Sequence, residues 1–359
     1  MTLLPNCGGV MRGGALQRFI KAQPTHATLD ALLPMKELPL KLELIRELEK
    51  LVKTDLMSSD NMFHFTNLQL SALSVMSIDT LQDLVKSLIR CLHIISHYTP
   101  QLQLPLLIQG KLLRCESRGV PQVSESSDNN IHQSANESEK CYLRDQRACV
   151  LTKATDARAC AIIPFTLTAS QENISTFTNS MFYSDILGHT TRANIGRIMH
   201  SQPLGGLNKS WNMLCLHPTL CTWWSQCLFG LKYLGFVTNG DGSSVAVQIQ
   251  FYWMPRNWVK PQELAEPPYD EAIDAMLQTV VADEQRDSFP DLESGKIFEV
   301  LIDNEEEALK MKVALECQWV AVRIAALSGA ARVWDLGLDV QEDADVYDTG
   351  SLDSSDSED

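Results

Sequence analysis

The apolar residues of this chain follow two different periods in two separate stretches, and this separation constrains the fold most strongly. Between residues 37 and 56 they recur every three or four positions, which is typical of an amphipathic helix. From residue 149 to residue 253 they come in short runs instead, and the last run alternates until Pro255 ends it. Helical and strand-like stretches that are segregated along the chain predict an α+β protein.

Two amphipathic helices are expected within a helical region at residues 31–115. The first spans residues 37–56, and the second begins near residue 77 and carries apolar side chains on one stripe as far as Ile95. The two helices are expected to pack as an N-terminal helical hairpin. Such a stripe usually faces a hydrophobic core, and binding of a protein partner through these helices is the alternative.

Three other segments have compositions that do not favour a core. Residues 1–30 contain several glycines without a sustained period, which predicts a flexible arm. Residues 116–140 are rich in Ser, Asn and Glu and contain no aromatic residue, which predicts a disordered linker. Residues 335–359 hold ten acidic residues and no basic one, which predicts a disordered acidic tail. A second folded unit is therefore expected at residues 141–334.

Composition also bears on location and on partners. No run of 18 apolar residues and no secretory leader is found, so neither a membrane span nor secretion is expected. The ten cysteines are scattered, which favours reduced thiols in an intracellular protein, cytoplasmic or nuclear. The net charge is −15, but residues 108–239 are near neutral, with twelve basic and nine acidic residues. This balance argues against strong binding of nucleic acid.

The unit from residue 141 onward is expected to contain strands and helices in mixed order. Pro218 suits the first position of a helix. The alternation at residues 245–253 predicts a half-buried strand, and residues 297–302 predict another. A short helix is expected near residues 269–281. Asp303 or Asn304 is expected to cap a long helix that continues to residues 328–329.

Several short motifs in this unit occur in the order found in a known family. The residues that carry the similarity are 149–152 (Cys-Val-Leu-Thr), 162–165 (Ile-Ile-Pro-Phe), 212–221 (Asn-Met-Leu-Cys-Leu-His-Pro-Thr-Leu-Cys), 229–232 (Phe-Gly-Leu-Lys), 248–255, 294–298 and 318–331. Together they resemble a fungal family of HNH-domain proteins over residues 141–331. The resemblance implies that residues 149–152 and 162–165 form strands, and that a ββα core is present.

The resemblance also implies a chemistry, namely metal-dependent hydrolysis of a phosphodiester in nucleic acid, with DNA as a candidate partner. A histidine at the end of the first strand acts as base, an asparagine supports it, and a histidine on the helix holds the metal. The corresponding positions in this chain are Ala161, Asn212 and Cys221. Alanine cannot accept a proton, and a cysteine thiolate suits zinc better than magnesium. We therefore expect an impaired or inactive HNH-like endonuclease, or else a non-catalytic module that binds nucleic acid or protein.

Some alternatives concern single residues of this core. A shifted alignment would make His217 a metal ligand together with Cys221 for a divalent ion such as Mg²⁺ or Zn²⁺, and His189 and His200 lie in the preceding predicted loop. Asn212 could instead brace a loop through backbone hydrogen bonds. A structural zinc site could use Cys149, Cys160, Cys215 and Cys221, although no Cys-x-x-Cys pair is present. The aromatic residues Trp211, Trp223, Trp224 and Phe229 could stack on bases, but their spacing favours packing in a core.

Overall fold

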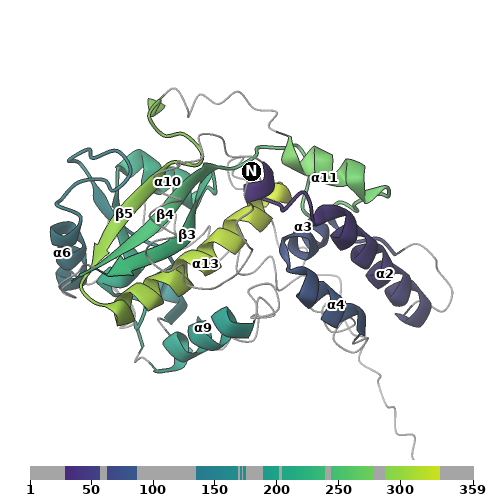
Figure 1. Cartoon of the computed structure of the whole chain (residues 1–359), viewed down its shortest axis with the longest axis horizontal. Coiled ribbons are helices and arrows are strands. Elements are labelled where there is room, and N and C mark those ends of the chain that lie inside the picture. The colour runs from purple at the N-terminus through teal and green to yellow at the C-terminus, as the bar shows by residue number, and fades with distance from the viewer. Residues whose placement is uncertain are drawn as a thin grey trace, which may run out of the picture.

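The computed structural model describes residues 29–56, 63–86, 135–174 apart from 169 and 172, 189–201, 204–238, 244–278 and 288–331. Figure 1 shows a three-stranded sheet with helix α13 lying along one of its faces. Helices α2, α3, α4 and α11 gather beside the C-terminal end of α13. The protein combines helices with small antiparallel sheets, so the predicted α+β class is confirmed.

The N-terminal helices pack together and against α13. They are α2 (Leu38–Leu56), α3 (Asn67–Val75) and α4 (Ile78–Lys86), preceded by a short 3-10 turn, η1 (Leu29–Ala31). Helix α2 confirms the first predicted helix, and α4 confirms the start of the second. The rest of the second helix and of the predicted helical region, at residues 87–115, lies outside the described part. The prediction of a two-helix hairpin did not include α3, which lies between α2 and α4 in the chain. The apolar stripe of α2 is buried (Leu42, Ile45, Leu48, Val52). It therefore packs in the hydrophobic core, as is usual for such a stripe.

One predicted boundary is wrong where the structure tests it. Helix α6 (Ala135–Arg144) occupies the end of the segment predicted as a disordered linker, residues 116–140. It buries Glu137 and Cys141 against the folded unit, which a composition-based prediction of disorder cannot anticipate. The rest of that linker, the arm up to residue 28 and the predicted tail at residues 335–359 lie outside the described residues.

Two short strands form an antiparallel ribbon that a helix follows. The strands are β1 (Arg158–Ala161) and β2 (Met213–Leu216), with Cys160 opposite Leu214, and the helix is α10 (Pro218–Ser225). The predicted strand at residues 149–152 is wrong, because these residues form a turn. Residues 162–165 are not a strand either, since β1 ends at Ala161 and a 3-10 turn, η2 (Phe165–Thr168), comes next.

The segment between β1 and β2 contains helix α9 (His189–Ser201) and the 3-10 turn η3 (Ser210–Asn212). The loop predicted around His189 and His200 is therefore wrong, because both residues belong to α9. Helix α9 packs against α13.

The larger sheet has the order β3–β4–β5, and all its pairs are antiparallel. Its strands are β3 (Phe229–Thr238), β4 (Val245–Trp253) and β5 (Ile297–Ile302), and the two further helices are α11 (Tyr269–Leu277) and α13 (Glu305–Leu327). The strands predicted at residues 245–253 and 297–302 and the helices predicted near residues 269–281 and after residues 303–304 are confirmed. The expectation that the first of these strands is half-buried is wrong, because consecutive residues of β4 are buried on both of its faces. Asn304 is the cap of α13, since its side chain accepts a hydrogen bond of 2.9 Å from the amide of Glu307.

The aromatic residues near α10 belong to the hydrophobic core. Trp224 is buried and stacks on Phe229 at 6.1 Å between ring centroids, and Phe229 stacks on Phe251 at 5.0 Å. Core packing is therefore the correct interpretation of this cluster for Trp224 and Phe229. Among the described residues, no helix is both long and apolar enough to cross a membrane.

Candidate functional site

The ribbon β1–β2 and the helix α10 bring together the residues that the sequence singled out. Asn212 directly precedes β2, Ala161 ends β1, and Cys221 lies within α10. One face of the ribbon packs near α10, and the other face packs against α6. The two faces of the ribbon carry different polar groups. Which residues lie on which face could not be deduced from the sequence motifs alone.

Asn212 is fully buried and uses its whole side chain in hydrogen bonds to the backbone. Its Nδ2 donates to the carbonyl oxygens of Ile163 at 2.7 Å and Leu207 at 3.0 Å. Its Oδ1 accepts from the amide of Ile163 at 3.0 Å. Asn212 thus ties the end of β1 to the segment before β2, which confirms the alternative that it braces a loop.

Replacing Asn212 by alanine is expected to lower the free energy of unfolding by about 2–3 kcal/mol, because it leaves buried backbone groups without partners. Urea denaturation would measure this loss. Asn194→Ala is the matched control, since the side chain of Asn194 accepts an exposed hydrogen bond of 3.3 Å from Arg197. It is expected to cost no more than about 0.5 kcal/mol. Equal losses in the two variants would contradict the bracing role.

The residues at the positions of the base and of the helix ligand, Ala161 and Cys221, are not free to act together. Ala161 is buried and pairs with Met213 at the end of the ribbon. Side chains alternate along a strand, so Cys160 and Ala161 project from opposite faces. It is Cys160 that meets α10, where it forms a disulfide with Cys221 across a Cα–Cα distance of 6.2 Å. The expectation of reduced thiols is wrong for this pair.

His217 caps α10 and does not act as a free ligand. Its Nδ1 accepts a hydrogen bond of 3.2 Å from the amide of Thr219, which places the ring proton on Nε2. That nitrogen lies 3.2 Å from the carboxylate of Asp156. Both ring nitrogens therefore have partners, and the sulfur of Cys221 is bonded to Cys160. The predicted metal pair of His217 and Cys221 is not available in this arrangement.

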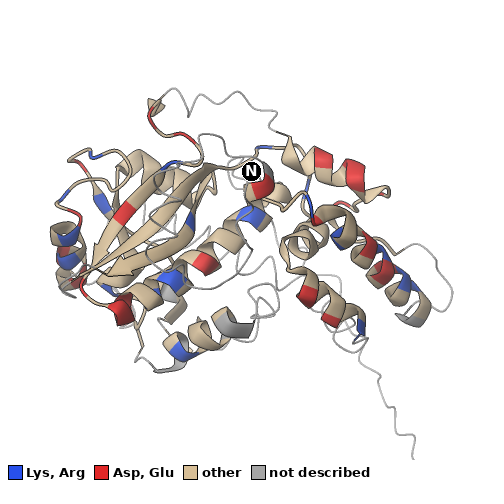
Figure 2. Cartoon of the chain, viewed as in Figure 1, with Lys and Arg blue, Asp and Glu red and all other residues tan. Residues whose placement is uncertain are grey.

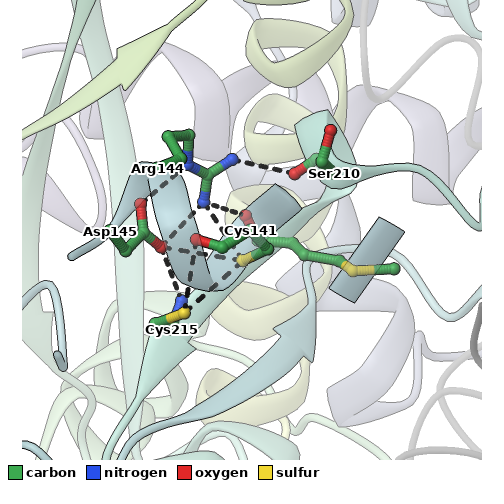
Figure 3. Close-up of polar contacts among 6 residues, drawn as sticks. Cys141, Arg144, Asp145, Ser210 and Cys215 are labelled. Carbon is green, nitrogen blue, oxygen red and sulfur yellow. Dashed lines mark hydrogen bonds and ion pairs between the residues drawn. The ribbon is translucent and has the colours of Figure 1, made fainter. Parts of the chain in front are cut away.

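The opposite face of the ribbon carries a polar cluster that the sequence did not reveal. Figure 3 shows Arg144 and Asp145 at the end of α6 beside the thiols of Cys141 and Cys215. Arg144 binds both carboxylate oxygens of Asp145, with Nε at 2.7 Å and Nη2 at 2.8 Å. Asp145 also accepts from the amide of Cys215 at 2.8 Å. The two sulfurs lie 3.6 Å apart.

Arg144 also joins α6 to the segment around β2. Its guanidinium donates to the carbonyl oxygens of Ser210 at 2.8 Å and Met213 at 2.7 Å. The Arg144–Asp145 ion pair is nearly inaccessible to solvent, with 9% and 3% of the side chains exposed. Burial opposes the charge of Arg144, but the hydrogen bond to Asp145 and its negative charge outweigh burial, and the pKa of Arg144 is raised. Arg144 therefore stays charged, and it binds both oxygens of the Asp145 carboxylate.

The thiol of Cys215 stays protonated near neutral pH. The hydrogen bond to Cys141, together with burial, raises the pKa of Cys215. The positive charge of Arg144 in this cluster is offset by the carboxylate of Asp145.

A metal ion could nevertheless find three ligands in this cluster. One sulfur each from Cys141 and Cys215 and a carboxylate oxygen of Asp145 lie within 4.8 Å of one another. The sulfur separation of 3.6 Å is close to the edge of a zinc tetrahedron, about 3.8 Å for Zn–S bonds of about 2.3 Å. Both oxygens of Asp145 are already bound by Arg144, however.

The zinc site suggested by the sequence is not formed. Cys160 and Cys221 are bonded to each other, whereas Cys215 lies on the other face beside Cys141, and Cys149 belongs to the main core. The one signal that could have indicated the observed cluster is the spacing of Cys141 and Asp145, four residues apart, because residues at i and i+4 share a helix face.

Comparisons of this chain with models of known protein families, with curated proteins and with solved structures found no match.

Proposed function

We propose that this chain is an HNH-like protein that has no nuclease activity and uses its ribbon and helix as a binding scaffold. The proposal rests on the order β1–β2–α10, on the family motifs in its sequence, and on the side chains at the three positions where the family has its chemistry. Two functions were expected from the sequence, an impaired HNH-like endonuclease and a non-catalytic binding module. The geometry of those side chains favours the second.

The observation that carries the proposal is that each of the three positions is closed to hydrolytic chemistry. Ala161 offers no atom that can accept a proton from water. Asn212 has all its polar side-chain atoms engaged with backbone groups. Cys221 is bonded to Cys160, so a covalent link joins the first strand to the helix. These residues hold the scaffold together, which is a structural task.

Incubation of the purified protein with supercoiled plasmid tests the proposal. No nicking is expected with Mg²⁺, Mn²⁺ or Zn²⁺, and none after addition of a reductant that frees Cys160 and Cys221, because Ala161 still provides no base. Nicking that depends on a divalent ion and disappears in His217→Ala would contradict the proposal. Measurement of bound metal by mass spectrometry would show whether the protein carries Mg²⁺ or Zn²⁺ in any case.

The charge pattern makes protein the favoured partner class over DNA. In Figure 2, acidic and basic residues are interspersed over the elements shown, without an extended basic stripe. Duplex binding that relies on phosphate contacts would weaken by about 10³-fold or more between 50 and 200 mM salt. We expect only weak binding in a fluorescence anisotropy titration with labelled duplex DNA. Tight binding with that steep salt dependence would instead assign the scaffold to nucleic acid.

A further inference from the structure

The thiols of Cys141 and Cys215 and the carboxylate of Asp145 lie close enough together to hold one metal ion. Cys141 is in α6, Asp145 directly follows that helix, and Cys215 belongs to β2. The two sulfurs are 3.6 Å apart, and Sγ of Cys141 is 3.7 Å from Oδ2 of Asp145. Figure 3 shows the three side chains converging between the helix and the strand.

These separations match the edges of a tetrahedral zinc site. With Zn–S bonds of about 2.3 Å and a Zn–O bond of about 2.0 Å, the edges are about 3.8 Å between two sulfurs and about 3.5 Å between sulfur and oxygen. The observed distances of 3.6 Å and 3.7 Å are close to both values. Zinc accepts a mixed set of sulfur and oxygen ligands, whereas Mg²⁺ and Ca²⁺ prefer oxygen alone. The ligand set therefore favours zinc.

Arg144 competes with an ion for the carboxylate of Asp145, but its own hydrogen bonds can adapt. Its Nη2 carries two hydrogens and has three acceptors: Oδ2 of Asp145 at 2.8 Å, the carbonyl oxygen of Met213 at 2.7 Å and Sγ of Cys141 at 3.4 Å. If Oδ2 turns to an ion, the other two acceptors still satisfy both hydrogens. Oδ1 of Asp145 keeps its bond of 2.7 Å from Nε. Arg144 can thus hold two of the ligands from outside, as partners of metal ligands commonly do.

The charges of the cluster also balance when zinc is bound. Thiols that bind a metal do so as thiolates and release their protons to solvent. The three negative charges of two thiolates and the Asp145 carboxylate then equal the three positive charges of Arg144 and Zn²⁺. This balance matters because both charged side chains are almost closed to solvent, where a net charge is costly. Burial also means that the ion is taken up as α6 packs on the ribbon during folding.

We propose that Cys141, Asp145 and Cys215 form a zinc site that ties helix α6 to strand β2. The three side chains supply three of the four positions of a tetrahedral ion, and water supplies the fourth. The site lies on the face of the ribbon that packs against α6, whereas the disulfide between Cys160 and Cys221 lies on the face that meets α10. The zinc site therefore does not depend on the function proposed for the ribbon and α10.

Production of the full chain in medium supplemented with zinc or with cobalt tests the site. After dialysis without reductant, the protein is expected to retain one zinc ion per chain by mass spectrometry. The cobalt form is expected to show thiolate-to-cobalt charge-transfer bands in the near ultraviolet and the visible d–d bands of a tetrahedral ion. Removal of zinc by a chelator is expected to lower the Tm, because the ion binds the folded chain.

Substitution of either thiol is expected to remove the ion. Cys141→Ser and Cys215→Ser should each weaken zinc binding by more than the roughly 10–100-fold that is typical when an outer partner of a ligand is lost. Cys317→Ser is the matched control, because Cys317 is a free thiol of α13, and it is expected to retain zinc. The double variant Cys160→Ala/Cys221→Ala is also expected to retain zinc, which separates this site from the disulfide.

The proposal is overturned if the wild-type protein produced with zinc carries none. It is equally overturned if Cys141→Ser or Cys215→Ser retains as much zinc as the wild-type protein, since the ion would then bind elsewhere. If the serine variants fail to fold, X-ray absorption by the zinc-loaded wild-type protein decides the question without any variant. Two sulfur ligands around the ion are expected, and any other number contradicts the site.

Discussion

Replacing Arg144 by methionine is expected to lower the free energy of unfolding by about 3–5 kcal/mol, because it leaves the buried carboxylate of Asp145 without its cation. The side chain of Asp145 is only 3% exposed, so water cannot take over the role of the guanidinium. The variant also loses the hydrogen bonds to the carbonyl oxygens of Ser210 and Met213. Urea denaturation followed by circular dichroism would measure the change, with a decrease in midpoint at an unchanged slope.

A second arginine three residues later provides a matched control. Arg147 is paired with Glu139, but both side chains are largely exposed, and Arg147→Met is expected to cost less than about 1 kcal/mol. The double variant Arg144→Met/Asp145→Asn removes the unpaired charge while an amide oxygen can still accept from Cys215. It is therefore expected to recover part of the stability lost in Arg144→Met. If Arg144→Met and Arg147→Met are equally stable, the buried ion pair does not contribute as argued.

Periodicity predicted the elements whose apolar residues recur at a regular spacing. The alternation that ends at Pro255 corresponds to β4, and the spacing at residues 37–56 corresponds to α2. Asn304 was identified as one of two possible caps of α13 because capping depends on a single residue type next to a helical pattern. In each of these cases a local pattern determines the element, so one sequence is sufficient.

Elements without a one-sided pattern were missed. Helix α3 is buried along its whole length, so no apolar stripe marks it, and its signature is the capping box formed by Thr66 and Gln69. Helix α6 is polar and was assigned to a linker, because its stability comes from contacts of Glu137 and Arg144 with the segment around residue 210. Tertiary contacts of this kind override composition.

The candidate sites depend on pairings between distant residues, which a single sequence does not contain. The motifs correctly indicated that Ala161, Asn212 and Cys221 belong to one unit, but they did not indicate that Cys160 is the partner of Cys221. Likewise, Cys141 and Cys215 are 74 positions apart, and only the packing of α6 on the ribbon brings their sulfurs together. Distances between side chains therefore had to come from the structure.

Reduction of the disulfide between Cys160 and Cys221 is expected to destabilise the protein by about 4 kcal/mol. The bond spans 61 positions of sequence, and closing a loop of this length removes that much conformational free energy from the unfolded chain in the chain-entropy description. The link also joins β1 to α10, whose mutual contacts are otherwise few. Urea denaturation with and without a phosphine reductant would measure the difference.

The double variant Cys160→Ala/Cys221→Ala separates this bond from other effects of the reductant. It is expected to be about as unstable as the reduced wild-type protein and to show no further loss on reduction through this pair. Cys317→Ala is the control, because Cys317 is a free thiol and its removal leaves the sensitivity to reductant unchanged. Titration of thiols under denaturing conditions should give two more on reduction of the wild-type protein than on reduction of the double variant. If the wild-type protein and the double variant gain equal numbers of thiols, or if reduction leaves wild-type stability unchanged, then Cys160 and Cys221 do not supply the link that holds the first strand to the helix.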